Sequence, residues 1–120
     1  MPEATTYHGS CHCGAVRYEV AGPPIGEAIS CNCSFCGRQG ALLSFFPASA
    51  FTLISSDGAL RDYQFGSRTV HHLFCGTCGI GSFGRGSMPD GTAMVAINVR
   101  CLEDVDLDGL TSTPFDGKSL

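Results

Sequence analysis

The chain has 120 residues, of which 43% are hydrophobic and 15% are charged, and this balance excludes an intrinsically disordered protein. We expect residues 1–120 to form a single domain, because a chain of this length does not hold a second core. The net charge of −4 argues against a nucleic-acid-binding protein, which normally presents a basic face. No apolar run approaches the ~20 residues that span a bilayer, so we expect no membrane protein.

Short stretches of alternating hydrophobic and polar residues recur along the chain and predict strands instead of helices. Val16, Tyr18 and Val20 alternate with Arg17 and Glu19, which is typical of a strand with one buried face. In chain order, the predicted strands cover residues 16–20, 41–46, 51–54, 60–65, 70–74 and 93–101. The acidic tail that starts at residue 103 is predicted to be a surface loop. The predicted fold class is therefore mostly β.

Cysteine is over-represented, with eight residues in this short chain. The N-terminal sequence lacks the basic start and the apolar run of a signal peptide, so we expect a cytoplasmic protein whose thiols bind metal instead of forming disulfides. Seven of the cysteines fall in three groups, which read Cys11-His-Cys13, Cys31-Asn-Cys33-Ser-Phe-Cys36 and Cys75-Gly-Thr-Cys78. Zinc takes four ligands in a tetrahedron, and such short spacings place thiolates at suitable separations.

The three groups predict two zinc sites of different character. The two pairs, at 11–13 and 75–78, would together form a closed four-thiolate site, and closed zinc sites are structural. The triplet at 31–36 supplies three thiolates. A zinc ion with three protein ligands leaves its fourth position to water or substrate, which is typical of catalytic zinc.

A histidine would instead close the second site, because three thiolates and one imidazole form a common structural zinc set. The candidates are His12, His71 and His72. His71 and His72 point to opposite faces of a regular strand, so they cannot both bind one ion. The remaining cysteine, Cys101, lies on the apolar face of the predicted strand 93–101 and is interpreted as a core thiol.

The cysteine groups and their neighbours also resemble a known family. The chain contains Gly-Ser-Cys11-His-Cys13-Gly-Ala-Val-Arg-Tyr, Cys31-Asn-Cys33-Ser-Phe-Cys36, His-Leu-Phe-Cys75-Gly-Thr-Cys78-Gly and Ala-Ile-Asn-Val-Arg-Cys101-Leu. This order, from about residue 9 to residue 101, resembles the family of glutathione-dependent formaldehyde-activating enzymes and centromere protein V. The resemblance implies a zinc-anchored fold of tented antiparallel sheets with two zinc ions per chain. It places the structural zinc on Cys11, Cys13, Cys75 and Cys78 and the catalytic zinc on Cys31, Cys33 and Cys36.

The family name implies a carbon–sulfur lyase that interconverts S-hydroxymethylglutathione with formaldehyde and glutathione. In this interpretation the substrate thiol binds the open position on the second zinc, which holds it as a thiolate near neutral pH. Arg38, two residues after Cys36, is the predicted contact for an anionic thiol, with Arg68 and Arg85 as weaker candidates. The expected partners are a small thiol and an aldehyde, without nucleic acid or membrane.

A second interpretation stays open at this stage. Both zinc ions would be structural, and the protein would be a non-catalytic module that binds another protein through its surface. Both interpretations predict two zinc ions per chain, and they differ in whether the second site responds to added thiols. Nucleic-acid binding through a zinc ribbon is a third interpretation, which the acidic charge disfavours.

Overall fold

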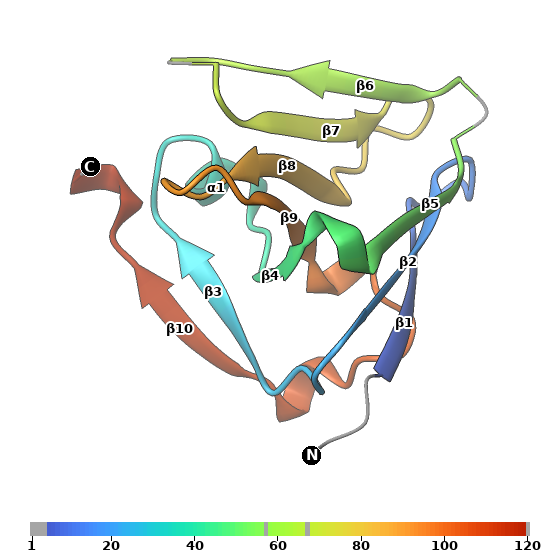
Figure 1. The fold of residues 1–120 in the computed structure, drawn as a ribbon, viewed down its shortest axis with the longest axis horizontal. Coiled ribbons are helices and arrows are strands. Elements are labelled where there is room, and N and C mark those ends of the chain that lie inside the picture. The colour runs from blue at the N-terminus through green and yellow to red at the C-terminus, as the bar shows by residue number, and fades with distance from the viewer. Residues whose placement is uncertain (1–4, 57, 67, 120) are drawn as a thin grey trace.

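The computed structural model describes residues 5–56, 58–66 and 68–119, whose strands form two sheets (Figure 1). The smaller sheet contains β1 (Thr5–Ser10), β2 (Arg17–Gly22) and β5 (Phe51–Ser55), in the order β1-β2-β5. The larger sheet contains β3 (Glu27–Cys31), β4 (Leu43–Pro47), β6 (Leu60–Tyr63), β7 (His71–Cys75), β8 (Phe83–Ser87), β9 (Ala93–Asn98) and β10 (Thr111–Phe115). Its strand order is β10-β3-β4-β9-β8-β7-β6. The predicted mostly β fold is confirmed.

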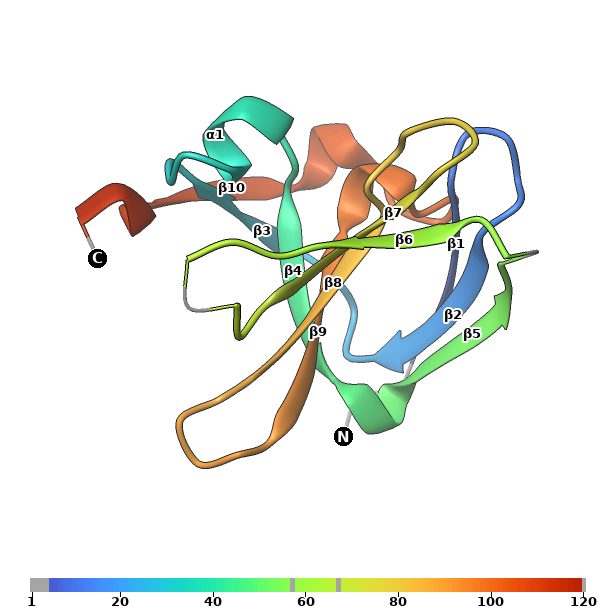
Figure 2. The ribbon, with the colours of Figure 1, turned by 90° about the horizontal axis from the view of Figure 1, so that it is seen from above.

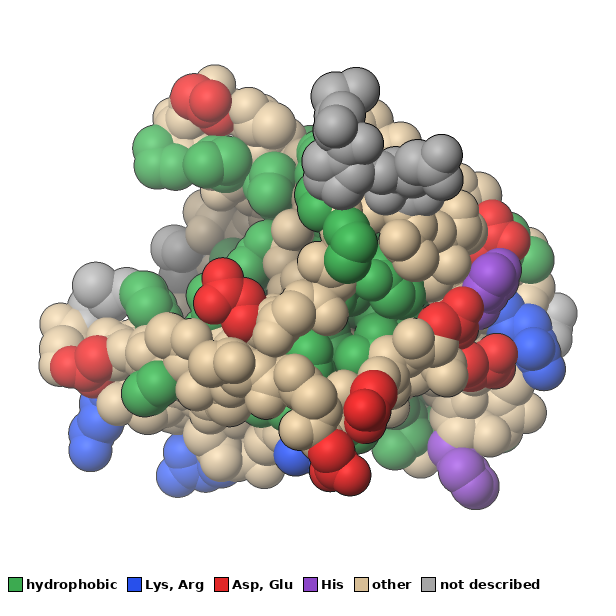
Figure 3. Space-filling view, turned by 90° about the horizontal axis from the view of Figure 1, so that it is seen from below, with side chains coloured by type: hydrophobic (Ala, Val, Ile, Leu, Met, Phe, Trp, Pro, Cys, Tyr) green, Lys and Arg blue, Asp and Glu red, His purple; other side chains and the backbone are tan. Residues whose placement is uncertain are grey.

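The two sheets form the sides of one compact unit. In Figure 1 the smaller sheet stands at the right and the β3–β10 pair at the left, while β6 and β7 run across the top. Strands β4, β8 and β9 lie between these two sides, in this view and in the view from above (Figure 2). Seen from below, acidic side chains are scattered over the face, and most basic side chains lie toward its edges (Figure 3).

The hydrophobic core lies between the sheets and follows the predicted alternation. Tyr18 on β2 packs against Phe51 and Phe83, with ring centroids 5.4 and 5.2 Å apart. Val95 and Ile97, alternate residues of β9, are completely buried. Burial of each such aliphatic side chain stabilises the fold by about 1.5–3 kcal/mol.

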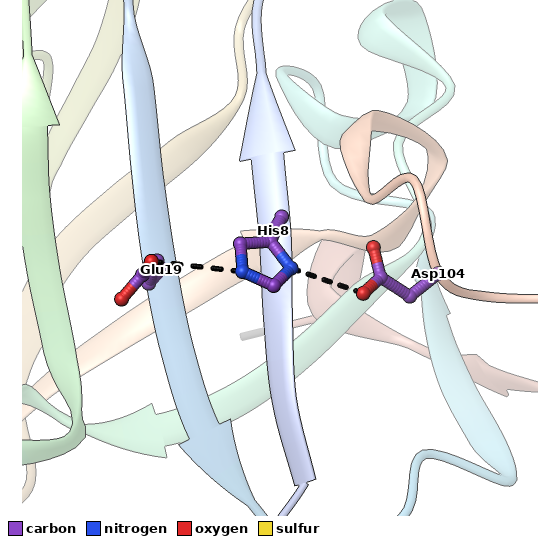
Figure 4. Close-up of polar contacts among 3 residues, drawn as sticks. All are labelled: His8, Glu19 and Asp104. Atoms are coloured by element: carbon purple, nitrogen blue, oxygen red, sulfur yellow. Dashed lines mark hydrogen bonds and ion pairs between the residues drawn. The ribbon is translucent and has the colours of Figure 1, made fainter.

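Strand β1 carries the chain into the first pair of cysteines and is fixed on both sides. A Cβ atom at Gly9 would overlap the ring of Tyr18, so this close approach requires glycine. His8 lies between two carboxylates (Figure 4), with Nδ1 3.1 Å from Asp104 Oδ2 and Nε2 3.6 Å from Glu19 Oε1. The backbone carbonyl of His8 also accepts a hydrogen bond from the N–H of Glu103, at 2.9 Å. These contacts join β1 to the segment that follows β9.

The C-terminal segment differs from the predicted surface loop. Strand β10 runs parallel to β3, from the pair Thr111 and Glu27 to the pair Phe115 and Cys31, so the larger sheet is mixed and not wholly antiparallel. All residues of β10 are exposed, so its sequence has no buried face to reveal a strand. Pro114 has no N–H to donate, and it is tolerated because β10 is an edge strand.

The helical elements are single turns. They are α1 (Cys36–Gln39) and the 3-10 helices η1 (Ala48–Ala50), η2 (Val99–Cys101), η3 (Leu107–Gly109) and η4 (Gly117–Ser119). The strand predicted over residues 93–101 therefore ends at Asn98, and η2 begins at the next residue, Val99. Among the described residues, no helix combines the length and the apolar character needed to cross a membrane.

Candidate functional site

Two distant parts of the chain form the first group of cysteines, which we call the four-cysteine cluster. Cys11 and Cys13 lie in the loop between β1 and β2, and Cys75 and Cys78 lie at the end of β7 and in the turn after it. The four Sγ atoms lie within 4.8 Å of one another, with Cys11 3.6 Å from Cys13 and Cys13 3.7 Å from Cys75. A tetrahedral zinc ion with bonds of about 2.3 Å holds its sulfur ligands about 3.8 Å apart. The cluster therefore fits one zinc ion.

A tight turn places Cys78 beside Cys75. The N–H of Gly79 donates to the carbonyl of Cys75 at 2.8 Å, and the N–H of Cys75 donates to the carbonyl of Ile80 at 3.0 Å. Gly79 has a φ of 83°, in the left-handed region that favours glycine. The sequence Cys-Gly-Thr-Cys-Gly thus specifies the turn that brings both sulfurs to one point.

Backbone amides favour the thiolate form in this cluster. The N–H of Thr77 donates to Cys75 Sγ at 3.4 Å. Hydrogen bonds from the backbone N–H groups of Cys13 and Ile80 lower the pKa of Cys78 to about 6. A metal ion requires deprotonated thiols, so these amides favour metal binding by Cys75 and Cys78.

The second group, which we call the cysteine triplet, is local in sequence. Cys31 ends β3, Cys33 lies in the loop that follows, and Cys36 begins α1. Their three Sγ atoms lie within 4.8 Å of one another, and all three residues are half-buried. The N–H of Cys36 donates to Cys33 Sγ at 3.3 Å, and the N–H of Gly37 donates to the carbonyl of Cys33 at 2.8 Å. The end of β3, the loop and the helical turn therefore supply all three thiols from one short segment.

The thiols of the triplet differ in acidity. Burial raises the pKa of Cys36 to about 12, and the neighbouring sulfur of Cys33 contributes to this shift. Burial acts in the same direction on Cys33, but the backbone N–H groups of Cys36 and Phe35 outweigh it and lower the pKa of Cys33. Cys33 therefore loses its proton more readily than Cys36, and a bound divalent cation would favour loss of the proton from Cys36.

The C-terminal segment packs on the triplet through Asn32. The backbone N–H of Asn32 donates to the carbonyl of Phe115 at 3.1 Å, and its side-chain amide donates to Asp116 Oδ1 at 3.0 Å. The side-chain oxygen of Asn32 accepts from the N–H of Lys118 at 2.8 Å. A Cβ atom added to Gly117 would lie 2.5 Å from Cys31 Sγ, so the backbone approaches this sulfur closely. Residues 115–118 therefore support one side of the triplet.

A cavity of about 870 Å³ opens on another side of the triplet. Its lining includes Ser34, Phe35, Cys36 and Arg38 from the triplet loop and helix, Tyr63, Phe65 and His72 from β6, β7 and the loop between them, and Phe83, Ala96 and Asn98 from β8 and β9. Natural small-molecule sites have cavities of about 300–1,000 Å³. The triplet therefore has access to a space large enough for a substrate.

Aromatic rings form the wall of this cavity next to Cys36. The ring of His72 lies 4.1 Å from that of Phe35 and 5.1 Å from that of Phe65, measured between centroids. Phe35 also stacks with Tyr63 at 5.9 Å. Burial lowers the pKa of His72, against an opposing effect of the Asp62 charge, so His72 is neutral at pH 7.

Comparison with known proteins agrees with this geometry. A family model described as glutathione-dependent formaldehyde-activating enzyme matches residues 6–112. The chain belongs to this family. A crystal structure of a protein from Rhodobacter sphaeroides is similar, with 36% sequence identity and a TM-score of 0.75. That match covers 89% of this chain and 97% of the other. The resemblance seen in the sequence is confirmed, and membership supports glutathione-dependent formaldehyde activation.

The arginines predicted to contact a family substrate lie in different surroundings. Arg38 lines the cavity, is exposed, and donates from its guanidinium to the carbonyl of Ser34 at 2.8 Å. Arg85 lies over the ring of Phe51 instead, 4.9 Å from its centroid, and contributes a cation–π contact at the core. Arg68 is exposed on the turn before β7 and, like Arg85, is not part of the cavity lining.

The histidines weighed as zinc ligands do not join either group of sulfurs. Within the described ranges, neither metal-binding group contains a histidine. His71 Nδ1 lies 2.6 Å from Asp62 Oδ2, and His72 belongs to the aromatic wall. His12 is exposed in the loop between Cys11 and Cys13.

Cys101 belongs to neither group of cysteines. It is half-buried on η2, so it does not continue the fully buried face that ends at Val99. Burial raises the pKa of its thiol. A neutral, inert thiol is consistent with this position.

Sequence patterns missed two features of the site, Asn32 with its partners and the aromatic wall. The contacts of Asn32 join residues more than eighty positions apart and use backbone groups, which leave no pattern in the sequence. The aromatic residues can be read from the sequence, but their proximity cannot. Phe35 and Phe65 come into contact only because β6 and β7 pass beside the triplet.

Proposed function

We propose that the protein is a zinc-dependent carbon–sulfur lyase that acts on the adduct of formaldehyde with a thiol, of the S-hydroxymethylglutathione type. The observation that carries this proposal is the cysteine triplet beside a cavity of about 870 Å³, with Cys36 in its wall. Family membership supports the same reaction class. In this proposal residues 1–120 act as one zinc-binding domain. All eight cysteines are free, which favours a reducing compartment, so we place the protein in the cytoplasm.

The two groups of cysteines would hold two zinc ions per chain. The four-cysteine cluster would hold a structural ion, and Cys31, Cys33 and Cys36 would hold the catalytic one. Thiolate sulfur is a preferred zinc ligand, and the sulfur separations fit the edges of a tetrahedron. When bound, the catalytic zinc supplies a fourth coordination position, at which a substrate sulfur is held as thiolate.

The reaction breaks the carbon–sulfur bond of the adduct HO–CH2–S–R. The bonding electron pair goes to sulfur, the hydroxyl proton leaves oxygen, and the products are formaldehyde and the thiol R–SH. The reverse reaction forms the adduct from the same two molecules, so no oxidant or reductant is required. In this scheme the triplet fixes the position of the sulfur, and the rings beside Cys36 form an apolar wall of the cavity. Arg38 is the residue in the wall able to contact a substrate carboxylate.

Formaldehyde release from S-hydroxymethylglutathione by the zinc-loaded protein tests this proposal. Cys36→Ser should abolish the release, whereas Cys101→Ser, a matched change outside both groups, should retain it. Cobalt substitution gives an independent readout, because added glutathione should change the absorption of the second site in the wild type. A second site with four protein ligands and no response to thiols would instead establish the non-catalytic zinc module.

A further inference from the structure

The cavity beside the triplet also bears on which thiol the protein accepts. We propose that it selects a thiol with an apolar, ring-bearing body, so that the preferred adduct is that of a hydrophobic thiol and not of glutathione. This inference rests on the proposed function, because it assigns the substrate class of the same site. It follows from the position, the exposure and the charge of the residues that form the wall.

The position of the rings connects the cavity to the triplet. Phe35 and Cys36 are neighbours in the chain, and both line the cavity. Phe35 stacks with Tyr63 at 5.9 Å and with Phe65 at 5.7 Å. A ligand body that occupies the cavity therefore meets aromatic surface directly beside the sulfur ligands.

The same rings are accessible to a ligand. Tyr63 is 48% exposed, Phe65 40% and Phe45 50%, although all three belong to the cavity wall. The core ring of Tyr18, which lies outside the cavity wall, is by contrast almost completely buried. Aromatic rings pack with one another at centroid distances of about 4.5–7 Å, and a ring in the ligand would cover this exposed surface.

The charges of the wall fit glutathione poorly. Glutathione carries two carboxylates and one ammonium group, and each is costly to remove from water without hydrogen bonds or a partner of opposite charge. Among the described residues that line the cavity, Arg38 is the single fully charged side chain, and its guanidinium already donates to the carbonyl of Ser34. None of these lining residues is Asp or Glu, the side chains that form ion pairs with an ammonium group. His72 in the aromatic wall is neutral at pH 7.

The net charge of the protein also disfavours glutathione. At −4 before any ligand binds, it repels an anionic tripeptide. A neutral thiol with an aromatic body avoids this repulsion and loses no ionic hydration on entering the cavity. The chemistry of the wall, and not the cavity volume, therefore favours the hydrophobic thiol.

Calorimetric titration of the zinc-loaded full chain with 2-phenylethanethiol and with glutathione tests the inference. We expect 2-phenylethanethiol to bind at least about tenfold more tightly. The alcohol 2-phenylethanol, which lacks the thiol, should still shift the NMR resonances of Tyr63, Phe65 and His72. This second readout does not depend on the metal chemistry.

Variants of the wall test whether its aromatic rings bind the thiol, or whether any exposed hydrophobic side chain has the same effect. Phe65→Ala and Tyr63→Ala should each weaken 2-phenylethanethiol binding by about fivefold, because each removes one aromatic contact. Phe65→Tyr should retain it. Ile54→Ala is the matched control, since Ile54 is 55% exposed but lies outside the cavity wall, and it should bind as the wild type does.

The outcomes distinguish this inference from the proposed function. Glutathione binding as tight as that of 2-phenylethanethiol, with cleavage of its formaldehyde adduct, would overturn the inference and leave the lyase proposal standing. A clear preference for 2-phenylethanethiol with formaldehyde release from neither adduct would support the substrate class and overturn the lyase proposal. Equal losses in Phe65→Ala and Ile54→Ala would overturn the assignment of the aromatic wall.

Discussion

The four-cysteine cluster and the cysteine triplet are assembled in different ways. The first takes two ligands from the loop between β1 and β2 in the smaller sheet and two from the end of β7 in the larger one. It therefore exists only when the two sheets pack together. The triplet lies within the single segment 31–36 and needs one loop and one helical turn.

The surroundings of the two groups differ as well. In the four-cysteine cluster Cys11 and Cys75 are 3% and 1% exposed, Cys78 is half-buried and Cys13 is exposed, whereas every member of the triplet is half-buried. The triplet lies between a cavity and the C-terminal segment, where a ligand is able to reach it. A metal that joins distant strands stabilises the whole fold, and a metal held by a local, accessible loop is able to act chemically at little cost to stability.

The largest effect should come from Cys75→Ser. A structural zinc site supplies folding free energy on the order of 10 kcal/mol, which is comparable to the total stability of a small domain. We expect this variant to be insoluble or unfolded by circular dichroism. Cys101→Ser is the control and should fold, because Cys101 belongs to neither group.

A smaller effect should follow from Cys36→Ser. This variant should keep the far-UV spectrum of the wild type while its zinc content falls from about two ions per chain to about one. The reason is that the two sheets remain joined through the four-cysteine cluster. If Cys36→Ser and Cys75→Ser aggregate alike, the division into a structural and a catalytic site is wrong.

The sequence predicted the parts of the fold that alternate between buried and exposed residues. The strand predicted from Val16, Tyr18 and Val20 is β2, whose Tyr18 and Val20 are buried as expected. The pattern fails for β8, which contains two glycines among five residues, and for β10, whose side chains are all exposed. Such strands are held by pairing with neighbours, and one-dimensional patterns do not record pairing.

The sequence likewise predicted one part of the candidate site and missed another. The spacing of the cysteines predicted the two groups of sulfurs, because two close pairs together supply the four ligands of one zinc ion and leave the triplet as a second group. The support of the triplet by residues 115–118 and the aromatic wall arise from contacts between distant segments. These contacts depend on the packing of the sheets, so the sequence alone does not reveal them.

Replacement of Asn32, which binds the C-terminal segment, should have an effect of intermediate size on zinc binding. Asn32→Ala removes the side-chain bonds to Asp116 and to the N–H of Lys118, which support the loop of the triplet. Loss of such outer contacts lowers metal affinity by about 10–100-fold, so we expect weaker zinc binding at the triplet with little change in overall stability. Competition with a chromophoric chelator measures this affinity.

A matched control tests the specificity of that effect. Gln64 also uses its side-chain amide in a hydrogen bond to a backbone carbonyl, that of Arg68, at 2.8 Å. Gln64→Ala should leave both zinc affinities unchanged. Unchanged affinity in Asn32→Ala would show that the loop and α1 hold the triplet without the C-terminal segment.

The smallest effect concerns His8, which contributes a pH-dependent contact on the strand that enters the four-cysteine cluster. The hydrogen bond to Asp104 raises the pKa of His8 against the opposing effect of burial, and the charges of Asp104, Glu19 and Glu103 add to the rise. The stability from protonated His8 is therefore fully present below its unfolded pKa of about 6.5 and is lost as pH rises through the higher folded pKa. Asp104→Asn should lower the melting temperature at about pH 6 and have no such effect at about pH 9. Asp108→Asn removes the same charge from the same segment and should change neither value, whereas an equal loss for Asp104→Asn at both pH values would assign its effect to packing instead of to the ion pair.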